Sequence, residues 1–277
     1  MQRRKFLQVS GLSTAAFLFT HFDPLSGNPI KVIRFPDAIS VRCGGEWYSL
    51  EGSTEVWKHE SIQVTLQLNE DVLSLSVSAP QREMEFIKCS WKQVFPVSSK
   101  FLADQWERSY GDLNWETPSL TSPPLTTTSL TPPSLVKRSP WYLMISDGLF
   151  TQAYGVKTGA NSFCSWQVSP DSLELFLDTN SGGMGVLLGE RTLHAADIIT
   201  TENLPGENPW HTDIRFCKMM CTNPRLPAKP VYGINDWYFA YGNNSRDLIL
   251  EHTRTMANLV NIPSNPPFSV IDMGWSV

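Results

Sequence analysis

Charged residues are scarce in this sequence, and basic residues are outnumbered by acidic ones. Charged side chains make up 18% of the 277 residues, whereas about 25% is usual in soluble proteins. The 22 lysines and arginines stand against 27 aspartates and glutamates, which gives a net charge of −5. A nucleic-acid-binding protein held by a basic surface is therefore excluded. The length suffices for about two domains with a buried core.

Cysteine is also sparse, and its spacing points to no metal or redox motif. The five cysteines lie at positions 43, 89, 164, 217 and 221, and this odd, scattered set gives no readable disulfide framework. Cys217 and Cys221 are four positions apart, which is not the spacing of a Cys-x-x-Cys motif, and no histidine lies near them at ligand spacing. The sequence predicts no metal site.

Long hydrophobic runs are absent, and the longest apolar stretch lies at the N-terminus. Arg3 and Arg4 precede an apolar run at 9–19, which is shorter than the ~20 residues that span a bilayer. This resembles a bacterial twin-arginine signal, so we expect residues 1–27 to direct export to the periplasm or the extracellular space. The cleavage point stays open, and an uncleaved signal would anchor the protein to a membrane. The alternative is an amphipathic N-terminus of the mature chain.

Aromatic residues, by contrast, are plentiful: 10 Trp, 7 Tyr and 14 Phe. Aromatic rings fill cores, and they also stack on the apolar faces of sugar rings. The composition is compatible with a carbohydrate-handling protein, with core packing alone as the alternative.

Alternating polar and apolar residues dominate the first two thirds of the chain. Residues 62–68 alternate strictly, and residues 72–78 repeat the pattern after a polar turn, which predicts a β-hairpin. Further short strands are expected at 47–50, 86–91, 141–146, 163–168, 173–177, 185–188 and 216–221. So many strands without intervening helices predict a large antiparallel β-sandwich over residues 28–222.

A low-complexity segment interrupts this domain at 117–135. Its nineteen residues are all Thr, Pro, Ser or Leu, and leucines recur every five positions. A period of five fits neither a helix nor a strand, and five prolines remove backbone donors. We expect an exposed insertion in the β domain, with an interdomain linker as the alternative.

The pattern changes after a proline-rich segment at 223–230, which we interpret as a linker. A short apolar run at 231–234 is followed by Ser245 as a candidate N-cap, a helix of about sixteen residues, and an apolar run at 268–272. This order predicts a βαβ unit whose two strands are parallel.

Three segments of the sequence resemble those of a known family. Residues 232–242 (YGINDWYFAYG) and 270–275 (VIDMGW) are similar to the first two strand–helix units in the (βα)8 barrel of melibiase-type α-galactosidases, and residues 104–115 (DQWERSYGDLNW) are similar to part of the β-sandwich that precedes that barrel. The resemblance implies a mainly β sandwich followed by the first βαβ unit of an incomplete (βα)8 TIM barrel at 231–277. It also implies a glycoside hydrolase with a carbohydrate substrate and no cofactor.

The resemblance also implies which side chains bind the sugar. Asp272 would hold sugar hydroxyls, Trp237 and Trp275 would shape the pocket, and Asp236 with Asn235 would lie beside them at the C-terminal ends of the strands. Alternatively, Asp236 caps a turn and the two tryptophans pack a barrel core. Independently of the family, a carboxylate at the end of an apolar strand needs partners, which favours a functional Asp272.

Two features depart from the family pattern. The family's second aspartate is Met273 here, and because a thioether accepts hydrogen bonds only weakly, a preference for galactose is not implied. The position before Asn235 is Ile234, where many relatives carry an aromatic residue.

The catalytic carboxylates of the family come from later barrel strands, beyond Val277. We therefore expect this chain to be an N-terminal portion that is inactive alone, with no catalytic residue of its own. The alternatives are a non-catalytic carbohydrate-binding sandwich, a structural envelope protein and a defunct truncated product.

Overall fold

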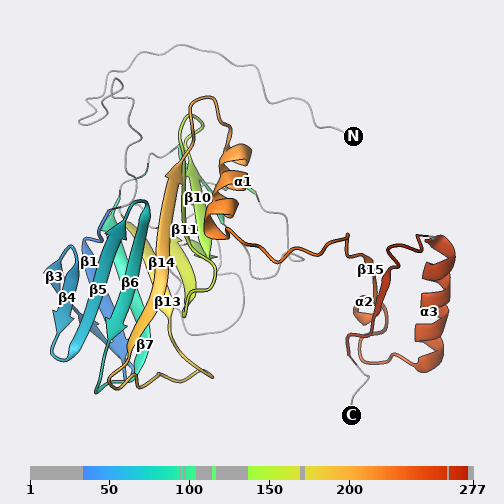
Figure 1. The fold of residues 1–277 in the computed structure, drawn as a ribbon, viewed down its shortest axis with the longest axis horizontal. Coiled ribbons are helices and arrows are strands. Elements are labelled where there is room, and N and C mark those ends of the chain that lie inside the picture. The colour runs from blue at the N-terminus through green and yellow to red at the C-terminus, as the bar shows by residue number, and fades with distance from the viewer. Residues whose placement is uncertain are drawn as a thin grey trace. The chain divides into compact units, whose positions relative to one another are not determined.

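The computed structural model describes residues 34–93, 95, 98–103, 114–116, 137–168, 172–260 and 262–273, and it divides into two compact units, Met1–Met220 and Cys221–Val277 (Figure 1). The expected export signal at 1–27, the low-complexity segment at 117–135 and most of the segment at 104–115 lie outside the described residues.

The first unit contains a six-stranded sheet in which every neighbouring pair is antiparallel. In spatial order its strands are β2 (Glu46–Ser49), β1 (Ala38–Cys43), β7 (Met84–Lys92), β13 (Ser172–Asp178), β12 (Phe163–Val168) and β9 (Lys137–Pro140).

A second, eight-stranded sheet is antiparallel as well. Its strands follow in the order β3 (Glu51–Ser53), β4 (Val56–His59), β5 (Ile62–Asn69), β6 (Val72–Ser78), β14 (Thr192–Glu202), β11 (Thr151–Val156), β10 (Tyr142–Ser146) and β8 (Lys100–Ala103). The hairpin expected over residues 62–78 is confirmed as β5 paired with β6.

One apolar core lies between the two sheets, because alternate residues of each strand point to the same side. Val41 and Ile87 of the six-stranded sheet and Leu66, Leu75 and Ile198 of the eight-stranded sheet are all at most 1% exposed and belong to one cluster. The expectation of a mainly β fold built from large antiparallel sheets is confirmed, and the arrangement is sandwich-like.

The strand expected at 216–221 is wrong, because this segment lies in and just beyond helix α1 (Pro209–Met220). The side chain of Asn208 accepts a hydrogen bond from the backbone N–H of His211 at 3.0 Å, and Pro209 occupies the first helical position. Thr212 and Phe216 are fully buried, and their spacing of four residues is helical. The apolar residues near the end of α1 were misread as a strand.

The strand expected at 185–188 is also not formed. Val186 makes only an isolated antiparallel bridge with Met84. Glycines at 182 and 183 adopt positive φ angles just before this point, so the chain turns there instead of extending.

Helix α1 covers the outer face of the eight-stranded sheet at β11 and β14 (Figure 1). Beneath it lies a second apolar cluster: Tyr142, Met144, Ala153, Ile199 and Phe216. This cluster explains why β10 is buried along both faces. A Cβ atom added at Gly155 would lie 2.9 Å from the Phe216 ring, so the helix packs against a bare backbone.

Three cysteines, Cys43, Cys89 and Cys164, are buried in the sandwich core. Burial raises the pKa of the Cys43 thiol to about 11 and that of Cys89 to about 12. All five cysteines lie within the described residues, and none forms a disulfide.

The second unit is built from β15 (Gly233–Asn235), α2 (Trp237–Ala240), α3 (Arg246–Leu259) and β16 (Phe268–Val270). The expected parallel pairing is confirmed, with Ile234 opposite Ser269. The side chain of Ser245 caps α3 by accepting a hydrogen bond from the Leu248 N–H. Among the described residues, every helix is too short or too polar to traverse a lipid bilayer.

Candidate functional site

The carboxyl ends of β15 and β16 bring two of the expected polar residues together. The side-chain amide of Asn235 donates a hydrogen bond to Oδ2 of Asp272 at 2.9 Å. Because parallel strands end at the same edge of a sheet, the last residue of β15 and the loop after β16 meet there. Both side chains are exposed, so the Asp272 carboxylate lies at a surface that a ligand can reach.

Asp236 lies beside them but is buried, at 7% exposure. Its Oδ1 accepts the backbone N–H of Asp272 at 3.0 Å, and its Oδ2 accepts the side-chain amide of Asn244 at 2.9 Å. The hydrogen bond from the Asp272 N–H, followed by that from Asn244, lowers the pKa of Asp236. Asp236 thus holds the loop that presents Asp272.

Asn244 completes this arrangement, and the sequence analysis missed it. Its side-chain amide donates to Asp236 and also to the backbone carbonyl oxygen of Met273. Its only sequence signal is its place directly before the N-cap Ser245, where a polar side chain is unremarkable. We name Asn235, Asp236, Asn244 and Asp272 the strand-end cluster.

The two expected tryptophans have different outcomes. The backbone N–H of Trp237 donates to Oδ1 of Asn235 at 2.8 Å, and its half-buried ring packs edge-on against Tyr241 with the centroids 5.4 Å apart. Trp275 lies outside the described residues. Met273 is 53% exposed. In this loop it is its backbone carbonyl oxygen that accepts a hydrogen bond, from the Asn244 side chain.

Residues of β15 and β16, with the two residues before β15, line an open hollow of about 230 Å³. It is lined by Val231, Tyr232, Gly233, Ile234, Asn235, Phe268 and Val270. Apart from Asn235 and the Tyr232 hydroxyl, its side chains are apolar, so it offers an apolar surface next to the strand-end cluster.

The described ranges contain no group of three His, Cys, Asp or Glu side chains that could hold a metal ion. The strand-end cluster offers carboxylate and amide oxygens that accept hydrogen bonds, and amide groups that donate them.

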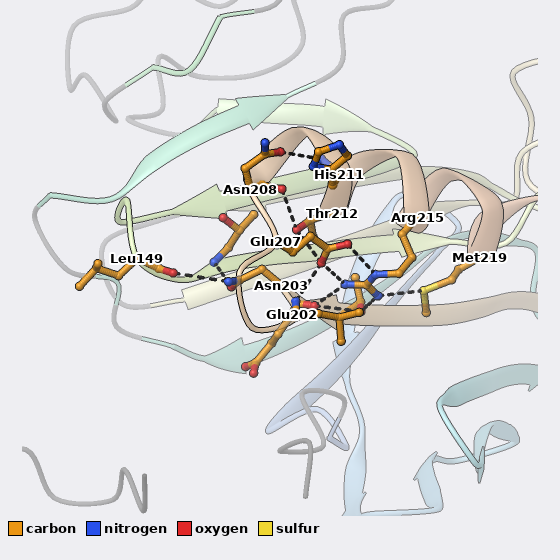
Figure 2. A network of polar contacts seen from close by, with 12 residues as sticks. Leu149, Glu202, Asn203, Glu207, Asn208, His211, Thr212, Arg215 and Met219 are labelled. Carbon is orange, nitrogen blue, oxygen red and sulfur yellow. Dashed lines mark hydrogen bonds and ion pairs between the residues drawn. The ribbon is translucent and has the colours of Figure 1, made fainter. Parts of the chain in front are cut away.

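A second polar network, in the first unit, was also missed by the sequence analysis (Figure 2). The Arg215 guanidinium makes two parallel bonds to Glu207, from Nε to Oε1 at 3.1 Å and from Nη2 to Oε2 at 2.9 Å. It also donates to Oγ1 of Thr201 and to the carbonyl oxygen of Glu202. This network fastens α1 to the end of β14.

Glu207 is the acceptor at the centre of this network. Besides Arg215, its carboxylate accepts the backbone N–H of Leu204 at 2.8 Å and the hydroxyl of Thr212 at 3.1 Å. These interactions, above all those with Arg215, lower the pKa of Glu207 to about 2. Because groups of the protein engage both carboxylate oxygens, we interpret the pair as structural.

Comparison with known proteins adds no family assignment. A search against models of protein families finds no match, and a search of curated proteins finds none either.

Proposed function

We propose that this chain is the N-terminal portion of an exported glycoside hydrolase that resembles the melibiase-type α-galactosidases. The enzyme would hydrolyse terminal glycosidic bonds of oligo- or polysaccharides. The observation that carries the proposal is the 2.9 Å hydrogen bond from the Asn235 side-chain amide to Oδ2 of Asp272, at the carboxyl ends of two parallel strands.

Two further observations support it. An antiparallel sandwich-like unit precedes a unit with parallel strands joined through a helix, which is the order of domains that the resemblance implies. Arg3 and Arg4 before a short apolar run support export.

In this proposal the residues of the chain bind and orient the sugar. The Asp272 carboxylate accepts hydrogen bonds from two neighbouring hydroxyl groups, while Asp236 and Asn244 keep its loop in place. Trp237 offers an aromatic surface beside the sugar ring. A retaining mechanism needs two carboxyl groups about 5–5.5 Å apart, and in this proposal later barrel strands supply both.

The experiment begins with the coding sequence. We expect the reading frame to continue after codon 277 with six more strand–helix units and with two aspartates at strand ends. The product of the whole frame is then assayed with aryl α-galactosides and with aryl glycosides of other sugars, and proton NMR of the first-formed sugar reports whether the anomeric configuration is retained.

A matched pair of variants tests the role of Asp272. Because hydrogen bonds to charged groups contribute about 1.5–3 kcal/mol, Asp272→Asn should lower kcat/KM roughly 10- to 100-fold. Asp247→Asn is the control, since this carboxylate on α3 is 91% exposed, and it should leave kcat/KM unchanged. A reading frame without further strand–helix units, or equal activity of the two variants, would overturn the proposal.

A further inference from the structure

The outer face of the six-stranded sheet carries three aromatic side chains that the core does not use. Phe86 and Phe176 alternate along their strands with core residues, and Trp47, on the neighbouring hairpin, is 46% exposed. The Trp47 ring centroid lies 6.3 Å from that of Phe86 and 6.4 Å from that of Phe176. The three rings form one contiguous surface, which we name the aromatic platform.

The backbone beneath Trp47 is held in place by a tight turn. Gly44 and Gly45 both have positive φ angles, 58° and 86°, as the two central residues of a close hairpin turn require. The Glu85 carboxylate accepts the Gly45 N–H at 2.6 Å. Because this backbone is already ordered, a ligand that stacks on Trp47 causes little further loss of conformational entropy, which favours binding.

Hydrogen-bonding groups flank the rings. The Lys88 ammonium lies 5.9 Å from the centroid of Trp47 and 6.0 Å from that of Phe176. The Glu174 carboxylate is 3.4 Å from the Lys88 ammonium and also accepts the hydroxyl of Ser90 at 3.3 Å. A donor and an acceptor thus stand at the edge of the aromatic surface.

The two cations beside the rings, Arg42 and Lys88, are each paired with an anion. Arg42 lies 3.1 Å from Glu85, and Lys88 pairs with Glu174. An anionic polymer would meet carboxylates as often as cations, and it would have to break these pairs. The face therefore favours a neutral ligand with both apolar surfaces and hydroxyl groups.

We propose that the aromatic platform binds a neutral carbohydrate chain. The C–H faces of the sugar rings pack on Trp47, Phe86 and Phe176, and hydroxyl groups exchange hydrogen bonds with Lys88 and Glu174. This site belongs to the sandwich and is separate from the strand-end cluster, so it does not depend on the proposed hydrolase activity.

The test is native affinity electrophoresis of the whole chain in gels that contain a soluble galactomannan, an arabinoxylan or a mixed-linkage β-glucan. At least one of these neutral polysaccharides should retard the protein. Trp47→Ala should weaken the affinity roughly tenfold or more, as loss of a central aromatic contact does. Trp47→Phe should keep part of the binding, and circular dichroism checks that each variant is folded.

The control is Trp210→Ala, because Trp210 is 67% exposed on α1, which packs on the other sheet. This variant should bind like the unmodified chain. A further gel contains polygalacturonate, an anionic polymer. Three results would overturn the proposal: no retardation by any of the neutral polysaccharides, equal binding of the two alanine variants, or retardation by polygalacturonate alone.

Asp272→Asn separates this proposal from the previous one. Retardation that persists in Asp272→Asn but is weakened in Trp47→Ala belongs to the platform, whatever Asp272 contributes to binding at the strand-end cluster. Loss of retardation in Asp272→Asn, with Trp47→Ala unaffected, would place the sugar at the strand-end cluster and overturn only the platform.

Discussion

Two carboxylates in this protein, Asp236 and Glu207, each accept hydrogen bonds from a backbone N–H and from side chains. Asp236 holds the Asp272 loop through an uncharged amide, whereas Glu207 binds a guanidinium through two parallel bonds. Paired bonds between opposite charges are stronger than bonds to neutral groups. Of these two carboxylates, Glu207 is therefore the one whose loss should affect folding stability more.

Replacing Glu207 by glutamine should lower the free energy of unfolding at pH 7 by about 1–3 kcal/mol, because Arg215 loses its charged partner. The folded-state pKa of Glu207 lies at about 2, below its ordinary value of 4.5. The carboxylate therefore contributes its full stabilisation above pH 4.5, and this contribution is lost as the pH falls towards 2. Urea denaturation at several pH values measures the difference.

The control for this prediction is Glu51→Gln, which alters an exposed carboxylate on β3. The urea concentration at which half of this variant is unfolded should match that of the unmodified chain at every pH. The assigned role would be contradicted if the difference in free energy of unfolding between Glu207→Gln and the unmodified chain stayed constant from pH 7 to pH 2.

The sequence allowed some contacts between individual residues to be predicted and not others. The resemblance implied that Asn235 and Asp272 lie together, because it places them at the C-terminal ends of neighbouring parallel strands. Asn244 and the Glu207–Arg215 pair could not be foreseen, since each depends on a loop or helix returning to a strand end. The spacing of residues in the sequence gives no signal for this kind of tertiary contact.

Helix α1 is the element whose packing is most demanding. Phe216 lies against Gly155 with no room for a methyl group. The same helix is also held by the ion pair between Arg215, in its middle, and Glu207, just before its first residue. Apolar contact and paired charges therefore hold the helix against the same sheet.

The Gly155→Ala variant should be less stable by about 1–3 kcal/mol, because its Cβ atom would lie 2.9 Å from the Phe216 ring. Thermal unfolding followed by circular dichroism measures the loss. A smaller side chain should relieve the clash, so Gly155→Ala combined with Phe216→Leu should lose less stability than the two separate losses added together. Strict additivity of the two changes would show that no clash exists.

Elements were predictable where one local pattern controlled them. Strict alternation predicted β5 and β6, and a capping serine predicted α3. Helix α1 was not predicted, because the strand expected at 216–221 rested on a short apolar stretch, whereas the signals for the start of the helix, Asn208 and Pro209, lie upstream of it. The order of strands in the two sheets joins segments far apart in sequence, so no local pattern contained it.

The chain divides into two compact units, Met1–Met220 and Cys221–Val277, and the second begins with an exposed proline-rich segment. Residues 222–230 are all exposed, and the packing of α1 on the sandwich ends before them. We therefore expect the first unit to fold without the second.

Brief trypsin treatment should cut after Arg225, since this residue lies in the exposed segment and Lys229 is protected by the following proline. The larger fragment should keep the thermal transition of the sandwich, as measured by mass spectrometry and circular dichroism. Immediate degradation of that fragment would contradict the self-sufficiency of the first unit. An Arg225→Gln variant, which removes the site, is the control.

The three thiols buried in the sandwich differ sharply in accessibility from Cys217, which is exposed on α1. An alkylating reagent should modify Cys217 in the native protein, whereas Cys89, with its raised pKa and no exposure, can react only when the two sheets separate. The rate at which Cys43, Cys89 and Cys164 are labelled therefore reports how often the sandwich opens, and the chain provides this probe without any engineered residue.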